Sequence, residues 1–365
     1  MVWIKRIAVL LFGTVLCLGA FLIGVVVFFD NATYSHAAAW VADTFFDSDL
    51  HIDGELTLHL GETLELNVGD VRLDAHDDSY HFSAKTLKTA IQLRPLLSGT
   101  VWINELQVNQ LFLKVNEAAS KSSGSFDPHL LPVVIAGANV QGLVFEYQEM
   151  PPGTLHQFSL NRLRLDDSAD NGAISIQGAG HFEGQSFRLR GSLPSIEDAL
   201  DPDRPAPVEL DVTGESGHVK IAGTIIDFMN GKGMDLQLDT ALQDTRLLLE
   251  WLDDGVPELG ELRFNARLRG DYAAPRLESI DANLHRGTEV DVNVSGSVDN
   301  IYSGAGFSLH IKGHSTQPDV ASWLLFGKLD QLKSLEFKGA LNEKDGHFYL
   351  SGVDAAASTR KGLSV

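Results

Sequence analysis

The chain has 365 residues, enough for two ordinary domains or one elongated body, and its formal net charge is −21. An acidic surface repels nucleic-acid phosphates, and no basic stripe offsets it, so the composition excludes a nucleic-acid-binding protein. Anionic lipid headgroups would not attract such a body either, so any lipid contact must come from apolar surface. The single cysteine, Cys17, lies in the first apolar run, which excludes intrachain disulfides and thiolate metal sites elsewhere.

The first predicted element is the run 7–29, which contains no charged side chain. As a helix with a rise of 1.5 Å per residue it would be ~34 Å long, enough to cross a bilayer. Lys5 and Arg6 precede it and aspartates follow it, so the positive-inside rule predicts a cytoplasmic N-terminus. A cleaved signal peptide is disfavoured because its apolar core would be only ~7–15 residues. We therefore expect an uncleaved anchor. Its representative membrane residues are Ile7, Leu11, Phe21, Val25 and Phe29.

A short helix is predicted next, over 32–46, because apolar residues recur there at helical spacing. Its apolar stripe is equally compatible with lying on the membrane surface and with closing one end of a following sheet. The stretch 117–131 is small, polar and Ser-rich, and it is predicted to be a loop. The predicted organisation is a tip and anchor over 1–30, a helix and β region over 31–116, the polar loop over 117–131, a central β region over 132–260 and β repeats over 261–365.

From His51 onward the apolar pattern has a period of two, which is typical of strands with one buried face. Val101 and Ile103 are out of phase with Leu106 and Val108, which predicts a β-bulge between them. About 18 strands are expected in all. The clearest cover 56–60, 64–68, 82–93, 101–115, 133–135, 140–147, 155–165, 173–182, 187–193, 208–212, 219–226, 234–238, 262–268, 289–297 and 335–341, with helical breaks at 195–200, 245–252 and 318–326.

An internal repeat is visible in the last third of the chain. The stretch 262–268 aligns with 335–341 at an offset of 73 residues, and a predicted short helix with a tryptophan, Trp251 or Trp323, precedes each copy. Repeats of this kind are typical of bodies whose units stack one on the next. The strand equivalent to 289–297 would begin near Leu363, so the second copy is expected to be incomplete.

Motifs for catalysis are missing from the sequence. None of the 13 histidines belongs to an H-E-x-x-H or similar ligand pattern, and there is no P-loop and no G-x-S-x-G elbow. Asp47 and Asp49 begin like a calcium loop, but His51 and Ile52 stand where an oxygen ligand and a glycine are needed. We therefore expect no catalytic residues, no metal site, no cofactor and no enzymatic activity.

The informative feature is that nearly every predicted strand has one aliphatic face, while few helices are available to cover it. One possibility is a β-sandwich, in which two such faces pack together. The other is a curved sheet whose apolar groove holds lipid acyl chains, where each buried methylene contributes ~0.8 kcal/mol. The candidate groove residues alternate along three strand patterns and share a face within each. They are Leu236, Leu238, Leu262, Phe264, Leu268, Val290, Val292 and Val294.

The N-terminal half contains an ordered series of short motifs. After the anchor come a G-x-L-x-L strand at 54–58, a D-V-x-L strand at 70–73 and an F-x-A-x-x-L strand at 82–87. The central signature is LRPLLSG at 93–99, followed by I-x-x-L-x-V at 103–108. The order of these motifs resembles the AsmA family of bacterial envelope proteins, most specifically over 1–165.

The resemblance implies a mainly β protein in which an N-terminal transmembrane helix is followed by an elongated, curved, mostly antiparallel β-groove with a few short helices. Larger members are similar to chorein-type bridge proteins that move phospholipid between membranes. The implied location is the bacterial inner membrane, with a single pass, a cytoplasmic N-terminus and a periplasmic body. The implied partners are membrane phospholipid and envelope-assembly proteins, so lipid handling toward the outer membrane and a non-enzymatic assembly scaffold both remain open.

Overall fold

The computed structural model describes residues 48–97, 101–116, 133–148, 155–167, 172–245, 260–317, 320, 332–344 and 347–359. The predicted anchor 7–29, the helix 32–46 and the loop 117–131 lie outside these ranges. Among the described residues, no helix is long and apolar enough to span a bilayer. The chain divides into two compact units, 1–190 and 191–365, a boundary that falls inside the predicted central region 132–260.

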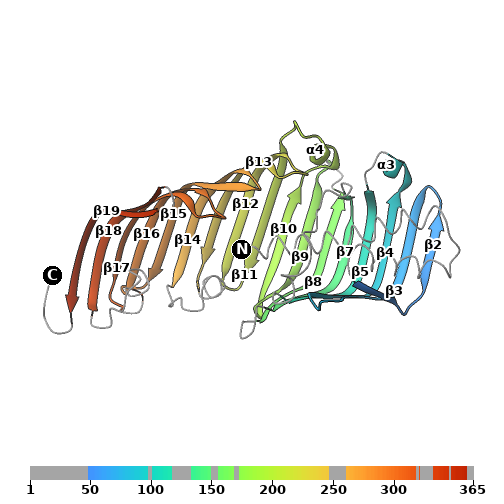
Figure 1. Ribbon diagram of the computed structural model, residues 1–365, viewed down its shortest axis with the longest axis horizontal. Helices are drawn as coiled ribbons and strands as arrows, with labels where there is room; N and C mark the ends of the chain where they lie inside the picture. The colour runs from blue at the N-terminus through green and yellow to red at the C-terminus, as the bar shows by residue number, and fades with distance from the viewer. Residues whose placement is uncertain are drawn as a thin grey trace. The chain divides into compact units, whose positions relative to one another are not determined.

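The described part of the first unit is a sheet of long strands with one short helix (Figure 1). Its elements are β1 (Ser48–Ile52), β2 (Leu56–Leu60), β3 (Thr63–Ala75), β4 (Tyr80–Gln92), α3 (Leu93–Leu97), β5 (Val101–Asn116), β6 (Val133–Ile135), β7 (Ala138–Gln148), β8 (Leu155–Asp167), β9 (Ile174–Phe182) and β10 (Gln185–Leu193). Pairing is antiparallel except that β6 and β7 run parallel to β5. Both β1 and β2 pair with β3, each along a different half of it.

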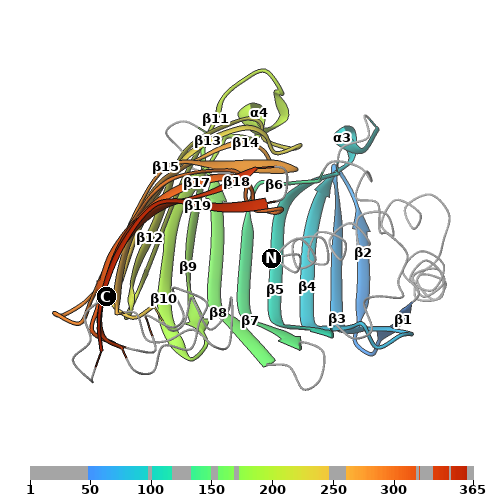
Figure 2. The same ribbon diagram turned by 60° about the vertical axis from the view of Figure 1, so that its left-hand side comes forward.

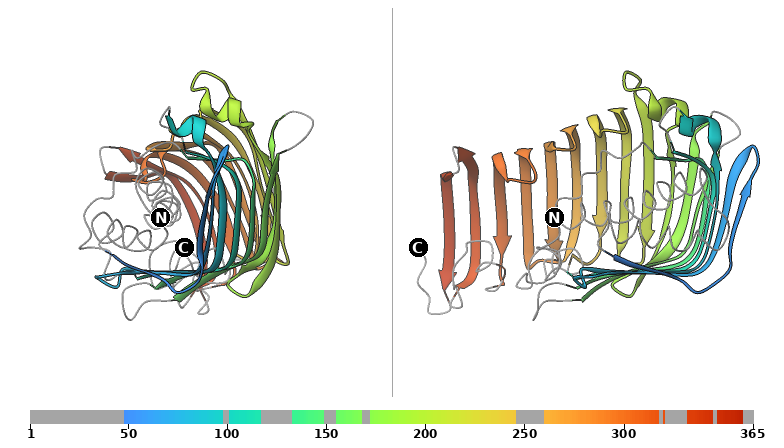
Figure 3. Two further views of the ribbon diagram at one scale, coloured as in Figure 1. Left: turned by 90° about the vertical axis from the view of Figure 1, so that its right-hand side faces the viewer. Right: turned by 45° about the vertical axis from the view of Figure 1, so that its right-hand side comes forward.

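A line of irregular residues crosses this sheet. Asp70 in β3, Gln110 in β5 and Gly142 in β7 have φ values of 44°, 51° and 68°, and each is skipped in the strand pairing while the register continues on both sides. Such an irregularity bends a strand and reverses its inward–outward alternation. The strands of the first unit are sharply bent (Figures 1 and 3). On β3, the strand β1 pairs with the half after the bend and β2 pairs with the half before it.

The reversal of alternation keeps the apolar side chains on one face across the bend. Leu66 and Val68 precede the irregularity in β3 and Leu73 follows it, and all three are buried. The same face continues through the neighbouring strands as one apolar cluster. Its most completely buried members are Leu64, Leu66, Ile91, Val101 and Leu113.

The second unit contains one short helix and nine strands that each pair antiparallel with the next. Its elements are α4 (Ile196–Leu200), β11 (Ala206–Gly214), β12 (Gly217–Asp227), β13 (Lys232–Leu242), β14 (Glu261–Asp271), β15 (Ala274–Arg286), β16 (Val290–Asn300), β17 (Ala305–Ser315), β18 (Leu332–Lys344) and β19 (His347–Thr359). The strands curve along their length (Figure 2). Within each unit the described strands form an open, curved sheet and not two sheets packed face to face.

The expected mainly antiparallel β fold with few helices is thus confirmed. The bulge predicted within 101–115 is present, because Ala90 pairs with Glu105 and the next residue, Ile91, pairs with Ile103. The helix predicted at 195–200 is α4, whose N-cap Ser195 accepts a hydrogen bond of 3.1 Å from the Asp198 amide. Helix α3 was not predicted; the strand predicted over 82–93 ends at its first residue, Leu93.

The 73-residue repeat also corresponds to structure. The aligned stretches 262–268 and 335–341 lie on β14 and β18, and the strands that follow, β15 and β19, both have 13 residues and begin 73 residues apart. The tryptophan-bearing stretches that precede the two copies lie outside the described residues, except for Val320.

A substitution at Leu113 tests how much the stability of the first unit depends on the burial of its apolar face. Leu113 is 1 % exposed, so Leu113→Ala should lower the free energy of unfolding by about 2–4 kcal/mol through lost burial and a residual cavity. Lys114→Ala, on the opposite face of the same strand, should change it by only about 0.5 kcal/mol. Urea unfolding followed by circular dichroism measures both, and equal effects would contradict a one-sided core.

Candidate functional site: the apolar face of the second unit

The strand register places all eight predicted groove residues on one face of β13–β16. Leu236 pairs directly with Leu268 on the neighbouring strand. Leu262 pairs with Leu284 of β15, which in turn pairs with Val292 of β16. Directly paired residues of adjacent strands point to the same side of a sheet, so these side chains form a continuous surface and not separate stripes.

The apolar face extends well beyond the predicted residues. One cross-strand row follows Val212, Val219, Thr240, Phe264, Ala282, Val294, Ile311 and Gly339, from β11 to β18. A second row follows Leu242, Leu262, Leu284, Val292, Gly313, Phe337 and Ala355, from β13 to β19. Every member of both rows is apolar or small, apart from Thr240. We call the surface formed by these rows and the predicted residues the apolar face.

Burial differs along the apolar face. Val290 and Val292 are 0 % and 1 % exposed, and Val320 packs on them with half-buried residues such as Leu284 around it. Leu236 is also buried. The remaining predicted residues are only half-buried. They are Leu238, Leu262, Phe264, Leu268 and Val294. The part of the face that Val320 contacts is therefore covered, while much of the rest retains apolar surface that another apolar group could cover.

Phe337 lies against a glycine in the middle of this face. A Cβ on Gly313 would come within 2.6 Å of the Phe337 ring and 3.2 Å of a Val292 methyl carbon. The lack of a side chain at Gly313 therefore lets the Phe337 ring lie close to the backbone of β17, and the apolar face is flatter at this point.

The opposite face of the same strands is polar and ion-paired. Asp235 accepts hydrogen bonds of 2.5 and 2.7 Å from Arg267 and of 3.0 Å from Arg269, which also lies 3.4 Å from Glu278. The hydrogen bonds from Arg267, and then those from Arg269, hold the pKa of Asp235 well below its ordinary value. This face is suited to water, so the sheet of the second unit is amphipathic.

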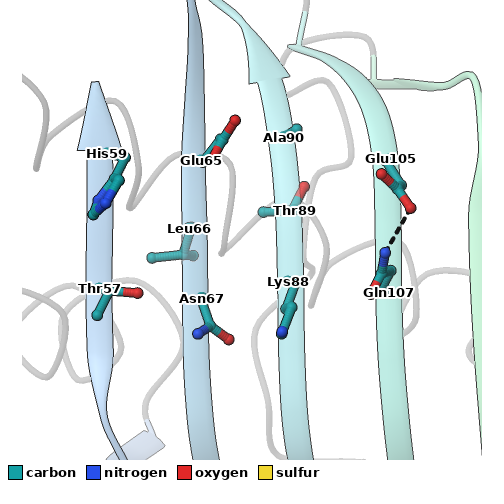
Figure 4. A pocket seen from close by; sticks show the side chains of 10 residues that line it. All are labelled: Thr57, His59, Glu65, Leu66, Asn67, Lys88, Thr89, Ala90, Glu105 and Gln107. Carbon is teal, nitrogen blue, oxygen red and sulfur yellow. Dashed lines mark hydrogen bonds between the residues drawn. The ribbon is translucent and has the colours of Figure 1, made fainter. Parts of the chain in front are cut away.

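The first unit offers a different surface, a shallow polar hollow of about 400 Å³ on β2–β5 (Figure 4). Glu65, Lys88 and Glu105 lie among its lining side chains, and Gln107 donates a 2.6 Å hydrogen bond to Glu105. The hollow contains no paired nucleophile and base. Within the described ranges, no group of three or more histidine, cysteine or carboxylate side chains could hold a metal ion.

Sequence reasoning found part of the apolar face and missed the rest. Leu284, Ile311 and Phe337 share the surface with the predicted residues, and their period-two spacing along β15, β17 and β18 was the available signal. The predicted anchor residues from Ile7 to Phe29 lie outside the described part of the chain.

No protein-family model matches the sequence, and a comparison with curated proteins returned no similar one. The fold and the face therefore define the molecule only as a mainly β protein with an open amphipathic sheet. The resemblance to the AsmA family stays a prediction from the motif order.

The close approach of Phe337 to Gly313 gives a stability test. Gly313→Ala should lower the free energy of unfolding by about 1–2 kcal/mol, because the ring must shift to admit the new methyl group. Gly339→Ala is the matched control on the next strand, since a Cβ there meets its nearest atoms at 3.5–3.6 Å. Chemical denaturation measures both, and an equal loss in the control would rule out the packing explanation.

The ion pairs of Asp235 give a pH test. Because the folded-state pKa is lowered, the contribution of Asp235 to stability is present above its unfolded pKa of about 4 and is lost as the pH falls below it. Asp235→Asn should cost about 0.5–1 kcal/mol at pH 7, as expected for partly exposed pairs, and progressively less as the pH falls below about 4. Thermal unfolding across this pH range measures the difference. Asp281→Asn, exposed on the same face outside this network, should have a smaller effect at pH 7.

Proposed function

We propose that the protein handles phospholipid, with the acyl chains lying on the apolar face of the second unit. The observation that carries the proposal is the unbroken apolar surface along cross-strand rows from β11 to β19, much of it only half-buried. Monomeric soluble proteins rarely leave large contiguous apolar surfaces uncovered unless something binds there. The ion-paired opposite face cannot play this role, because an acyl chain there would displace water from charged groups.

The chemistry of the face suits acyl chains better than a polar small molecule. Its rows contain aliphatic, aromatic and glycine residues, with Thr240 as the one hydroxyl in the two rows. Each methylene removed from water contributes ~0.8 kcal/mol, so a chain can bind without any polar contact and can occupy successive positions at similar free energy. Nine strands at a spacing of ~4.8 Å give a surface of ~40 Å along the direction of strand pairing.

The predicted anchor gives this activity a location. A helix over 7–29 with a cytoplasmic N-terminus would tether the β units on the far side of a bacterial inner membrane. On the motif resemblance, we propose that lipid passes from this membrane toward the outer membrane. The sequence holds no nucleotide-hydrolysis motif, so directed transport would require another component.

A second candidate function is a non-enzymatic scaffold that modulates the assembly of outer-membrane proteins. It is favoured by β19, which among the described strands pairs only with β18. Tyr349, Leu350 and Val353 of this strand are 53 %, 60 % and 53 % exposed. An edge strand of this kind can accept an extended segment of another protein by backbone hydrogen bonding.

Photocrosslinking from the apolar face tests the lipid proposal in the full chain. With a benzophenone amino acid in place of Phe264, irradiation in native membranes should yield a covalent phospholipid adduct that mass spectrometry identifies. The same amino acid in place of Asn265, on the polar face, should yield at least five-fold less adduct.

A charge-matched pair of variants completes this test. Adding Leu238→Asp and Leu262→Asp, both half-buried on the apolar face, should abolish the adduct at position 264, because the carboxylates disfavour acyl chains. Adding Gln237→Asp and Ser295→Asp, on the polar face, should preserve it. An adduct of equal yield from both faces, or none from either, would sink the proposal and favour the scaffold.

A further inference from the structure

Exposed apolar side chains gather at one end of the second unit. In the antiparallel meander, the turns that join β12 to β13, β14 to β15 and β16 to β17 lie at the same end, and α4 lies at this end too (upper edge in Figure 1). We call the large apolar residues exposed there the tip row. They are Leu200 (39 % exposed), Ile226 (44 %), Met229 (37 %), Tyr272 (46 %) and Tyr302 (36 %).

The opposite end of the same strands has a different composition. The described turns there consist of Glu215 and Ser216 between β11 and β12, and of Gly287, Thr288 and Glu289 between β15 and β16. None of these is a large apolar residue. Among the fully described turns of the second unit, the tip row is thus confined to one end of the sheet.

Neighbouring tips are held together by backbone contacts. The Tyr272 amide donates a 2.7 Å hydrogen bond to the Gly231 carbonyl, and the Ile301 amide donates one of 2.9 Å to the Pro275 carbonyl. The rings of Tyr272 and Tyr302 meet edge to face, with centroids 6.2 Å apart. Because the tips are braced in this way, contact with a partner surface would cost little conformational entropy.

The charged groups at this end of the second unit indicate which kind of partner surface could bind the tip row. Arg204 pairs with Glu197 and Asp198, at 3.1 and 2.9 Å, and Lys232 lies 3.9 Å from Asp227. Both of these basic groups lie beside carboxylates, so neither offers a free positive charge to an anionic surface. Tyrosine rings, which combine an apolar body with a polar hydroxyl, are enriched at the interface between bilayer and water.

We propose that the tip row docks this end of the second unit onto the surface of a zwitterionic bilayer. The inference rests on the proposed function and deepens it. Docking brings this end of the strands to the headgroup layer, so acyl chains pass from the bilayer onto the adjoining edge of the apolar face. The apolar tips supply the contact, and the binding is insensitive to salt because no net positive charge takes part.

Depth-dependent fluorescence quenching tests this docking in the full chain. The chain is reconstituted into phosphatidylcholine vesicles in a Cys17→Ala background, with an environment-sensitive dye on Ser303→Cys beside Tyr302. The matched control places the dye on Thr288→Cys at the opposite end. Lipids with a nitroxide close to the headgroup should quench the dye at 303 at least three-fold more than the dye at 288.

A variant of the tips separates docking from the membrane anchor. Met229→Ser, Tyr272→Ser and Tyr302→Ser together should reduce quenching at 303 to the level at 288, while a circular dichroism spectrum unchanged from that of the parent protein reports that the sheet is still folded. Replacing 30 % of the lipid by phosphatidylglycerol should weaken quenching. Equal quenching at both ends, or quenching that survives the triple variant, overturns docking. If the protein without the triple substitution gives no phospholipid adduct but the dye at 303 is still quenched, the proposed function is contradicted and docking is not.

Discussion

Cross-strand register is the constraint on which both units depend. Each strand satisfies its backbone groups by pairing with the next, and a shift of one residue would turn every side chain of a strand to the other face. In the second unit, rows such as Leu262, Leu284 and Val292 stay in step across many strands, so one face is apolar and the other carries Asp235 and its arginines. The amphipathic character follows from this register, since neither face is built by a second layer of described elements.

Irregular residues interrupt the strand pairing at single positions without destroying it. In the first unit, Asp70, Gln110 and Gly142 interrupt three strands at one level, and the apolar side chains return to the same face beyond them. The bend and the preserved face are therefore two effects of the same local change. In the second unit the register shifts between Asn265 and Arg267, and again between Leu277 and Ile280. There too the rows continue on either side.

The period-two pattern of the sequence was sufficient to predict most strands and to predict which residues share a face within each strand. Period two identified the residues from Leu236 to Val294 that share one apolar face, and the phase change after Ile103 revealed the bulge at Asn104. Gln110 was missed because a polar residue next to Asn109 looks like an ordinary exposed position until its pairing is known. Helix α3 was missed because its five residues are too few to show a helical period, and the strand pattern before it runs up to Leu93. The continuity of the apolar face depends on which residues pair across strands, and no single strand pattern contains that information.

The 73-residue repeat indicates how the second unit can change in length. One 73-residue period corresponds to four strands, β14 to β17, and four is an even number. Inserting or deleting a whole period would return the chain to the same end of the sheet, running in the same direction, with its apolar side chains on the same face. Evolution could therefore lengthen or shorten the second unit in steps without redesigning any strand, and the reach of the molecule would vary while the chemistry of its surface stayed constant.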